Sequence, residues 1–134
     1  MEFIYKQKSS SYARVGDVLV SVNRAGGYKN KDSRYTLVFS FTEKAHKMVF
    51  GNVEYAIFAF EDDKIYFTSG DKRTGFKITS KERAPLRVFK ATILGALKKY
   101  SCDAWIGQYN LKYCPEKKLW YINRSEKLIN VDNS

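Results

Sequence analysis

The sequence predicts an α+β fold, a largely antiparallel sheet with one short and one long helix. Apolar residues alternate with polar ones in at least five short segments, which is typical of half-buried strands. Two further segments carry apolar residues at three- and four-residue spacing, the period of an amphipathic helix. The 134 residues are enough for one domain with a hydrophobic core. We expect this domain at residues 1–124, followed by a frayed tail at 125–134.

The first half of the chain contains four predicted strands and the short helix. The strands cover residues 14–24, 35–41, 53–60 and 64–69, and the acidic turn at 61–64 joins the last two as a hairpin. After the second strand, Ser40 and Glu43 fit a capping box, so a helix should run from about Phe41 to Val49 and be stopped by Gly51 and Asn52. The helix contains His46, the one histidine of the chain, which we expect to be a semi-buried or surface residue rather than a catalyst.

The long helix is predicted at residues 84–100. Pro85 suits a first helical turn, and apolar side chains recur along one face. These apolar residues are Leu86, Phe89, Ile93, Leu97 and Tyr100. Beside them lies a predicted basic stripe made of Arg83, Arg87, Lys90 and Lys98, with Leu94 exposed within it. The alternative is an ordinary core helix whose solvated flank carries these cations.

Three more strands are predicted at residues 75–80, 104–114 and 119–124. With them the chain contains two possible β-α-β-β units, one at 35–69 and the other at 75–124. Such a repeat would place both helices on one face of a continuous antiparallel sheet and leave the other face open. The alternative is coincidence, because a small α+β domain generates this pattern easily.

The chain is strongly basic. Lysine and arginine number 24 against 14 acidic residues, which gives a net charge of +10. Residues 1–40 contribute +4, residues 83–134 contribute +6, and the middle of the chain is neutral. A basic field at both ends favours a polyanionic partner, although a generic solubility charge is the alternative.

Two further groups of cations are candidates for contacts with phosphates. The glycine-containing loop at 25–34 carries Tyr28, Lys29, Lys31 and Arg34. Lys117 and Lys118 lie in the turn of the last predicted hairpin. Together with the basic stripe they form our predicted nucleic-acid-binding set, in which Tyr28 would stack on a base. The alternative for the loop is a flexible hairpin tip.

Aromatic residues make up 16% of the chain, and several alternate with lysines in the predicted strands. The candidates are Tyr55, Tyr66, Tyr109, Tyr113 and Tyr121, together with Lys77 and Lys112. On an open sheet face they would resemble the stacking platforms of single-strand binders, but the same alternation also describes a plain half-buried sheet. Trp105 and Trp120 are either wedges against bases or, as we favour, core anchors of the final hairpin.

The sequence contains no motif that predicts catalysis, a cofactor or a metal. Phosphate-binding glycine loops and a nucleophile elbow are both absent from it. A metal-dependent nuclease could be imagined from Glu54, Asp62 and Lys64, but aspartates are common in turns for backbone reasons. Cys102 and Cys114 are too few for a disulfide framework. A single bridge between them is the alternative to the two reduced, semi-buried thiols that we expect.

These observations predict a small non-catalytic protein that binds nucleic acid, either DNA or RNA. The alternative is a regulator or inhibitor that docks on an acidic surface of a nucleic-acid-processing enzyme. The N-terminal residues do not resemble a signal peptide, and no apolar run approaches the ~20 residues of a membrane span. We therefore expect a cytoplasmic protein without a membrane partner.

Overall fold

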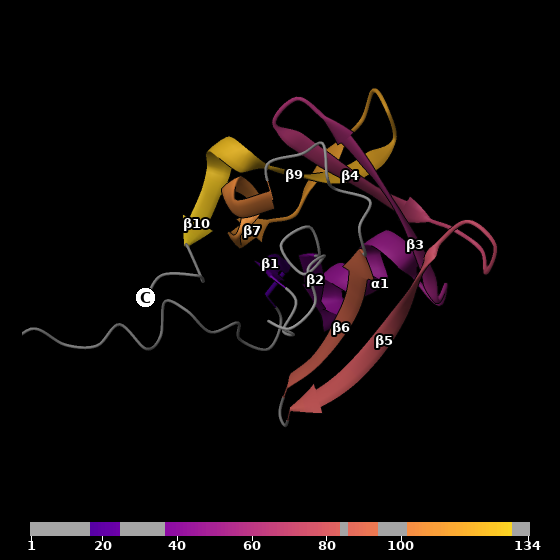
Figure 1. The fold of residues 1–134 in the computed structure, drawn as a ribbon. Helices are drawn as coiled ribbons and strands as arrows, with labels where there is room; N and C mark the ends of the chain where they lie inside the picture. The colour runs from indigo at the N-terminus through magenta and orange to yellow at the C-terminus, as the bar shows by residue number, and fades with distance from the viewer. Residues whose placement is uncertain (1–16, 25–36, 84–85, 94–101, 130–134) are drawn as a thin grey trace, which may run out of the picture.

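A computed structural model describes residues 17–24, 37–83, 86–93 and 102–129 (Figure 1). The first four strands and the helix are β1 (Leu19–Arg24), β2 (Leu37–Thr42), α1 (Glu43–Phe50), β3 (Tyr55–Glu61) and β4 (Lys64–Ser69). The remaining strands are β5 (Phe76–Arg83), β6 (Leu86–Ile93), β7 (Gly107–Asn110), β8 (Lys112–Cys114), β9 (Leu119–Asn123) and β10 (Lys127–Ile129). Short 3-10 turns occupy Cys102–Trp105 and Arg124–Glu126.

The ten strands form one sheet in the order β10-β7-β1-β2-β6-β5-β3-β4-β9-β8. Each pairing that the structure describes is antiparallel. The sheet is strongly curved, because β7 and β8 lie near opposite ends of this order and yet follow each other along the chain. Only Leu111 separates them, and its backbone N–H donates to the Val18 carbonyl at 3.4 Å. The segment 107–114 therefore joins the two ends of the curled sheet.

The core lies inside this curl and is rich in phenylalanine. The Phe39 ring of β2 lies 4.7 Å from Phe58 of β3 and 5.9 Å from Phe67 of β4. Phe41, also on β2, contacts Phe67 and the Phe50 ring of α1, each at 5.2 Å. Strands that are distant in the sheet order thus face each other across a common core. The helix packs against β2, β4 and β6 (Figure 1).

The predicted α+β class with a long helix is wrong, because residues 86–93 form strand β6. This strand lies between β2 and β5, and Ala91 is paired with Phe39 on one side and Ile78 on the other. Its aromatic and β-branched residues suit a strand as well as a helix, and their alternation places Ala91 and Ile93 in the core. The second β-α-β-β unit accordingly has no helix at 86–93; residues 94–100 of the predicted helix lie outside the described residues.

The short helix is present, but it begins later than predicted. Thr42, not Ser40, is the cap, and its Oγ1 accepts a hydrogen bond from the backbone N–H of Ala45 at 3.4 Å. The same hydroxyl accepts from the Leu19 N–H at 3.1 Å and donates to the Asp17 carbonyl at 2.6 Å. The helix ends at Gly51, whose φ of 60° lies in the left-handed region that glycine adopts easily. Thr42 thus caps the helix and also attaches it to β1.

The C-terminal part of the chain belongs to the sheet beyond the predicted boundary at residue 124. Lys127 and Ile129 of β10 pair with β7, and the Lys127 Nζ donates to the Ala104 carbonyl at 3.0 Å. The expected frayed tail therefore does not begin at residue 125. Residues 130–134 lie outside the described residues.

The turn between β4 and β5 leads to the first testable prediction. A Cβ at Gly75 would lie 2.8 Å from the Tyr55 Cβ and 3.1 Å from the Asp71 carbonyl oxygen, atoms that cannot move without the backbone. We expect Gly75→Ala to lower the free energy of unfolding by about 1–3 kcal/mol, the usual range for overpacking. Gly70→Ala is the matched control, because its closest contact is the movable Ile57 Cγ1 at 2.7 Å. Urea denaturation should show a smaller loss for Gly70→Ala, and equal losses would contradict the prediction.

Candidate functional site

The predicted basic stripe does not exist as one helical surface. Arg87 and Lys90 are three residues apart on a strand, so they lie on opposite faces of β6. Arg87 forms an ion pair with Glu82 of β5, with its Nη2 3.4 Å from Oε1. Arg83 is the last residue of β5. Five members of the predicted binding set lie outside the described residues, namely Tyr28, Lys29, Lys31, Arg34 and Lys98.

The two lysines of the last hairpin turn differ in their surroundings. Lys117 forms an ion pair with Glu61, with its Nζ 2.9 and 2.8 Å from the two carboxylate oxygens, and it lies 5.0 Å above the Tyr66 ring. The hydrogen bond to Glu61 raises the pKa of Lys117 above its usual value. Lys118 is exposed in the turn, with a φ of 54°. The charge of Lys117 is therefore compensated within the chain.

The tyrosines do not form an open stacking platform. Tyr109 is fully buried, and its hydroxyl donates to the Trp105 carbonyl at 2.7 Å. Tyr66 is 4% exposed beneath Lys117, whereas Tyr113 is 46% exposed. Burial also raises the pKa of Tyr109, so its hydroxyl stays protonated. The plain half-buried sheet, which was the alternative to the stacking platform, describes these residues better.

A polar pocket of about 200 Å³ lies on the side of β1, β2, β5 and β6 that faces away from the core. The strand register creates it, because Ser21, Ser40 and Lys90 are directly paired across β1, β2 and β6. Lys81 of β5 is paired with Val88, which shares a face with Lys90. The described residues that line this pocket are Ser21, Asn23, Ser40, Phe41, Thr42, Lys81, Val88 and Lys90. We refer to it as the outer pocket.

The outer pocket presents mainly hydrogen-bond donors. Its lining residues include two ammonium groups, the hydroxyl groups of Ser21 and Ser40 and one amide, whereas the Thr42 hydroxyl already donates to the Asp17 carbonyl. None of the described lining residues is a carboxylate. Elsewhere in the sheet, Lys77 lies 3.7 Å from Glu54, and Lys112 forms an ion pair with Glu126. Sequence reasoning identified Lys90 but missed Lys81, Ser21, Asn23 and Ser40. Reading 76–93 as two alternating strands that pair as a hairpin, with residue 83 opposite residue 86, would have placed Lys81 and Lys90 on one face.

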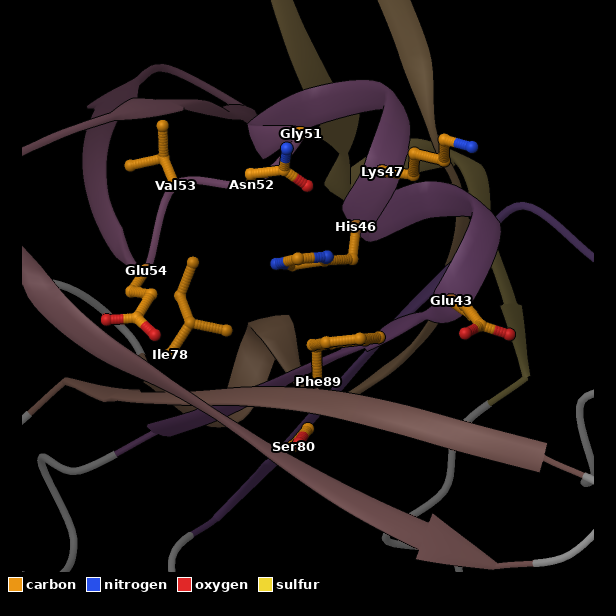
Figure 2. Close-up of a pocket in the computed structure, with 10 residues that line it drawn as sticks. All are labelled: Glu43, His46, Lys47, Gly51, Asn52, Val53, Glu54, Ile78, Ser80 and Phe89. Atoms are coloured by element: carbon orange, nitrogen blue, oxygen red, sulfur yellow. The ribbon is translucent and has the colours of Figure 1, made fainter.

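A larger pocket of about 440 Å³ lies between α1 and the β5–β6 pair (Figure 2). The imidazole of His46 projects from α1 into it and stacks on the Phe89 ring, with a centroid distance of 3.8 Å and an interplanar angle of 5° (Figure 2). His46 is only 8% exposed. Burial lowers the pKa of His46 below its usual value, although the charge of Glu43 partly opposes this effect. We refer to this space as the His46 pocket.

The three residues from which a nuclease site could be imagined, Glu54, Asp62 and Lys64, do not come together in the structure. Glu54 precedes β3, whereas Asp62 and Lys64 lie at the opposite end of that strand. Glu54 is instead paired with Lys77. In the described part of the chain, no group of three or more histidine, cysteine, aspartate or glutamate side chains could hold a metal ion.

The buried imidazole predicts that stability depends on pH. His46 has a folded-state pKa below 6.5, so the unfolded chain takes up the proton first as the pH falls. The free energy of unfolding should therefore decrease as the pH drops through about 6.5 and on through the lower pKa of the folded state. Urea denaturation at pH 7.5 and 5.5 measures this loss.

His46→Phe is the matched variant, because a phenyl ring can keep the stack on Phe89 but cannot be protonated. Its stability should change less between the two pH values than that of the parent chain. Asp71 does not interfere, because hydrogen bonds from Thr74 and Arg73 hold its pKa below 3.8. An equal pH dependence in both proteins would contradict the prediction.

Within the residues that the structure describes, no helix is long and apolar enough to cross a lipid bilayer. Comparison with known proteins identifies no relative: no protein-family model, no curated protein and no solved structure matches the chain. The chemistry of the two pockets is therefore the basis for assigning a function.

Proposed function

We propose that this chain is a non-catalytic protein that binds nucleic acid, and that the outer pocket receives a backbone phosphate. The observation that carries the proposal is the composition of this pocket. Lys81 and Lys90 supply ammonium groups next to Ser21, Asn23 and Ser40, and the described lining residues include no carboxylate. Ammonium, hydroxyl and amide donors are the groups that contact nucleic-acid phosphates in proteins.

The position of the outer pocket supports binding to an extended polymer. It lies on a sheet face built from four neighbouring strands, so a strand of nucleic acid could continue beyond it over Thr79 and Thr92, which are exposed. The net charge of +10 would draw a polyanion towards the chain from any direction. Phosphate contacts carry little base information, so binding should tolerate many sequences.

The test is a double substitution, Lys81→Glu and Lys90→Glu, measured with labelled single- and double-stranded DNA and RNA at two salt concentrations. We expect affinity to fall for every sequence and the slope of log K against log salt to shrink by about 0.7–0.9 for each lost contact. The matched control is Lys72→Glu with Arg73→Glu, which makes the same change of charge in the exposed turn between β4 and β5.

Two outcomes would overturn the proposal. If both double variants weaken binding equally, the net charge rather than the outer pocket is responsible. If the parent chain binds none of the nucleic acids at low salt, the function is wrong, and an acidic protein surface becomes the better partner for this face. Circular dichroism of each variant checks that the fold is retained.

A further inference from the structure

The His46 pocket contains a buried polar group that faces open space. His46 is 8% exposed, and Figure 2 shows its imidazole directed into the cavity. Its ring contacts in the described structure are aromatic, with Phe89 at 3.8 Å and Phe50 at 5.6 Å between centroids. No hydrogen bond to the imidazole nitrogens is formed by the described residues. Because no described side-chain nitrogen is both sealed from solvent and without a hydrogen bond, the imidazole nitrogens are open to the cavity and can be reached by a molecule that enters it.

The charges around this pocket differ from those of the rest of the chain. Its described lining residues include two carboxylates, Glu43 and Glu54, and one ammonium group, Lys47. The lining itself is therefore net acidic on a chain of net charge +10, and Glu54 also forms an exposed ion pair with Lys77, which lies outside the lining with its Nζ 3.7 Å from the Glu54 Oε2. The remaining walls combine the apolar side chains of Val53, Ile78 and Phe89 with the polar side chains of Asn52 and Ser80. Carboxylates beside these apolar side chains favour a cation that carries an apolar body and disfavour phosphate.

We propose that the His46 pocket binds a small organic cation, a protonated amine or a guanidinium group with an apolar body. The cation would donate hydrogen bonds to the carboxylate of Glu54 and to the unprotonated imidazole nitrogen of His46. The apolar body would lie against Val53, Ile78 and the edge of Phe89. This site is separate from the outer pocket, because Phe89 and Lys90 are consecutive residues of β6 and therefore lie on opposite faces of the strand.

Three probes of one size test the proposal: benzylamine as the cation, benzyl alcohol as the neutral analogue and benzoate as the anion. Titration of the parent chain, followed by the NMR signals of the His46 ring, should show saturable shifts with benzylamine. Its affinity should be at least tenfold higher than that of benzyl alcohol, and benzoate should bind more weakly still. Shifts of equal affinity with all three probes, or no shift of the His46 signals with benzylamine, would overturn the proposal.

Variants that each remove one carboxylate charge test whether benzylamine binds in the His46 pocket. Glu54→Gln and Glu43→Gln should each weaken benzylamine binding by about two- to fivefold, the effect of an exposed ion pair. Glu82→Gln is the matched control, because it removes the same charge from a carboxylate that pairs with Arg87 and does not line the pocket. Equal weakening in the control would show that benzylamine responds only to the total charge and would overturn the site.

The pH provides a readout that does not depend on variants. Around His46 the pocket lining carries Glu43 and Lys47 on α1 and Glu54 before β3, and the residues that β5 and β6 contribute to it are uncharged. His46 is then the group whose protonation would repel the ligand, and burial keeps it neutral at pH 7.5. Benzylamine affinity should therefore fall as the pH drops through the folded-state pKa of His46, which a pH titration of the His46 ring signals without ligand locates. An affinity that does not change across that transition would show that the amine does not contact His46 and would overturn the proposal.

The same chemistry could come from a free amine or from a basic side chain of a peptide. A short acetylated glycine peptide with one central lysine distinguishes the two sources. Displacement of benzylamine by this peptide would identify a peptide side chain as an occupant, whereas no displacement would restrict the site to small molecules. Failure of the nucleic-acid experiment does not affect this one, because the probes here are small and the residues differ.

Discussion

Replacing Phe39 by alanine is expected to lower the free energy of unfolding by about 3–5 kcal/mol. Phe39 is fully buried in β2, and its ring packs on Phe58 at 4.7 Å and on Phe67 at 5.9 Å. Phe39 therefore connects β2 with β3 and β4 across the core. Its loss leaves a cavity that rigid strands cannot fill. Because domains are stable by only about 5–15 kcal/mol, the variant should lose a large part of its stability. Urea denaturation followed by tryptophan fluorescence measures the change.

Met48→Ala is the matched control, because this side chain is 40% exposed on α1 and alanine suits a helix. It should change the free energy of unfolding by less than about 0.5 kcal/mol, as surface substitutions usually do. Similar losses of unfolding free energy in the two variants would show that Phe39 does not pack in the core between β2, β3 and β4.

Ala91→Asp should unfold the protein or destabilise it by at least about 3 kcal/mol, because it would bury an unpaired charge. Ala91 is 1% exposed in β6, between Phe39 on one neighbouring strand and Ile78 on the other. This substitution also separates the observed strand from the predicted helix. On a helix over 84–100, position 91 would lie opposite the apolar face formed by Leu86, Phe89 and Ile93, and aspartate there would be a surface change of less than about 0.5 kcal/mol.

Thr92→Asp is the control for this prediction, since Thr92 is the next residue of the same strand and is exposed. It should cost about 1 kcal/mol or less, the range of strand propensities. The free energy of unfolding from urea titrations decides between the two structures. A stable Ala91→Asp variant with a stronger helical circular dichroism signal would contradict strand β6.

The parts of the fold that could be predicted from sequence depend on local signals. The hairpin of β3 and β4 follows from alternation on both sides of an acidic turn, and Asp62 adopts the positive φ of 53° that such a turn tolerates. The short helix follows from a hydroxyl before Glu43 and from Gly51 at its end. Even there, the predicted cap was Ser40, whereas the observed cap is Thr42, which is also held by its contacts with β1.

Segment 86–93 could not be assigned from sequence, because its pattern satisfies two periods at once. Leu86, Phe89 and Ile93 have helical spacing, whereas Phe89, Ala91 and Ile93 have strand spacing. Because the pattern fits both forms, the neighbouring strands decide between them. Strands β2 and β5 both pair with this segment and satisfy its backbone groups on both sides.

The candidate sites were even less accessible from sequence. Lys90 was predicted, but as part of a helical stripe with Arg87, which the structure places on the other face of the strand and pairs with Glu82. Lys81, Ser21 and Ser40 come close to Lys90 only through the register of four strands. His46 was recognised as a histidine of a short helix, but its burial against Phe89 depends on where β6 lies.

By itself, the sequence determined the features that depend on neighbours within a few residues: the basic charge, the antiparallel hairpins, the short helix and its end at Gly51. Only the tertiary structure decided that β6 is a strand, that Tyr66 and Tyr109 are buried, and that Lys81 and Lys90 share a pocket. The physical reason is that alternation specifies which side chains share a face of one strand, whereas pairing between strands specifies which faces meet. Pairing is set by contacts between residues far apart in the chain, and no local pattern encodes it.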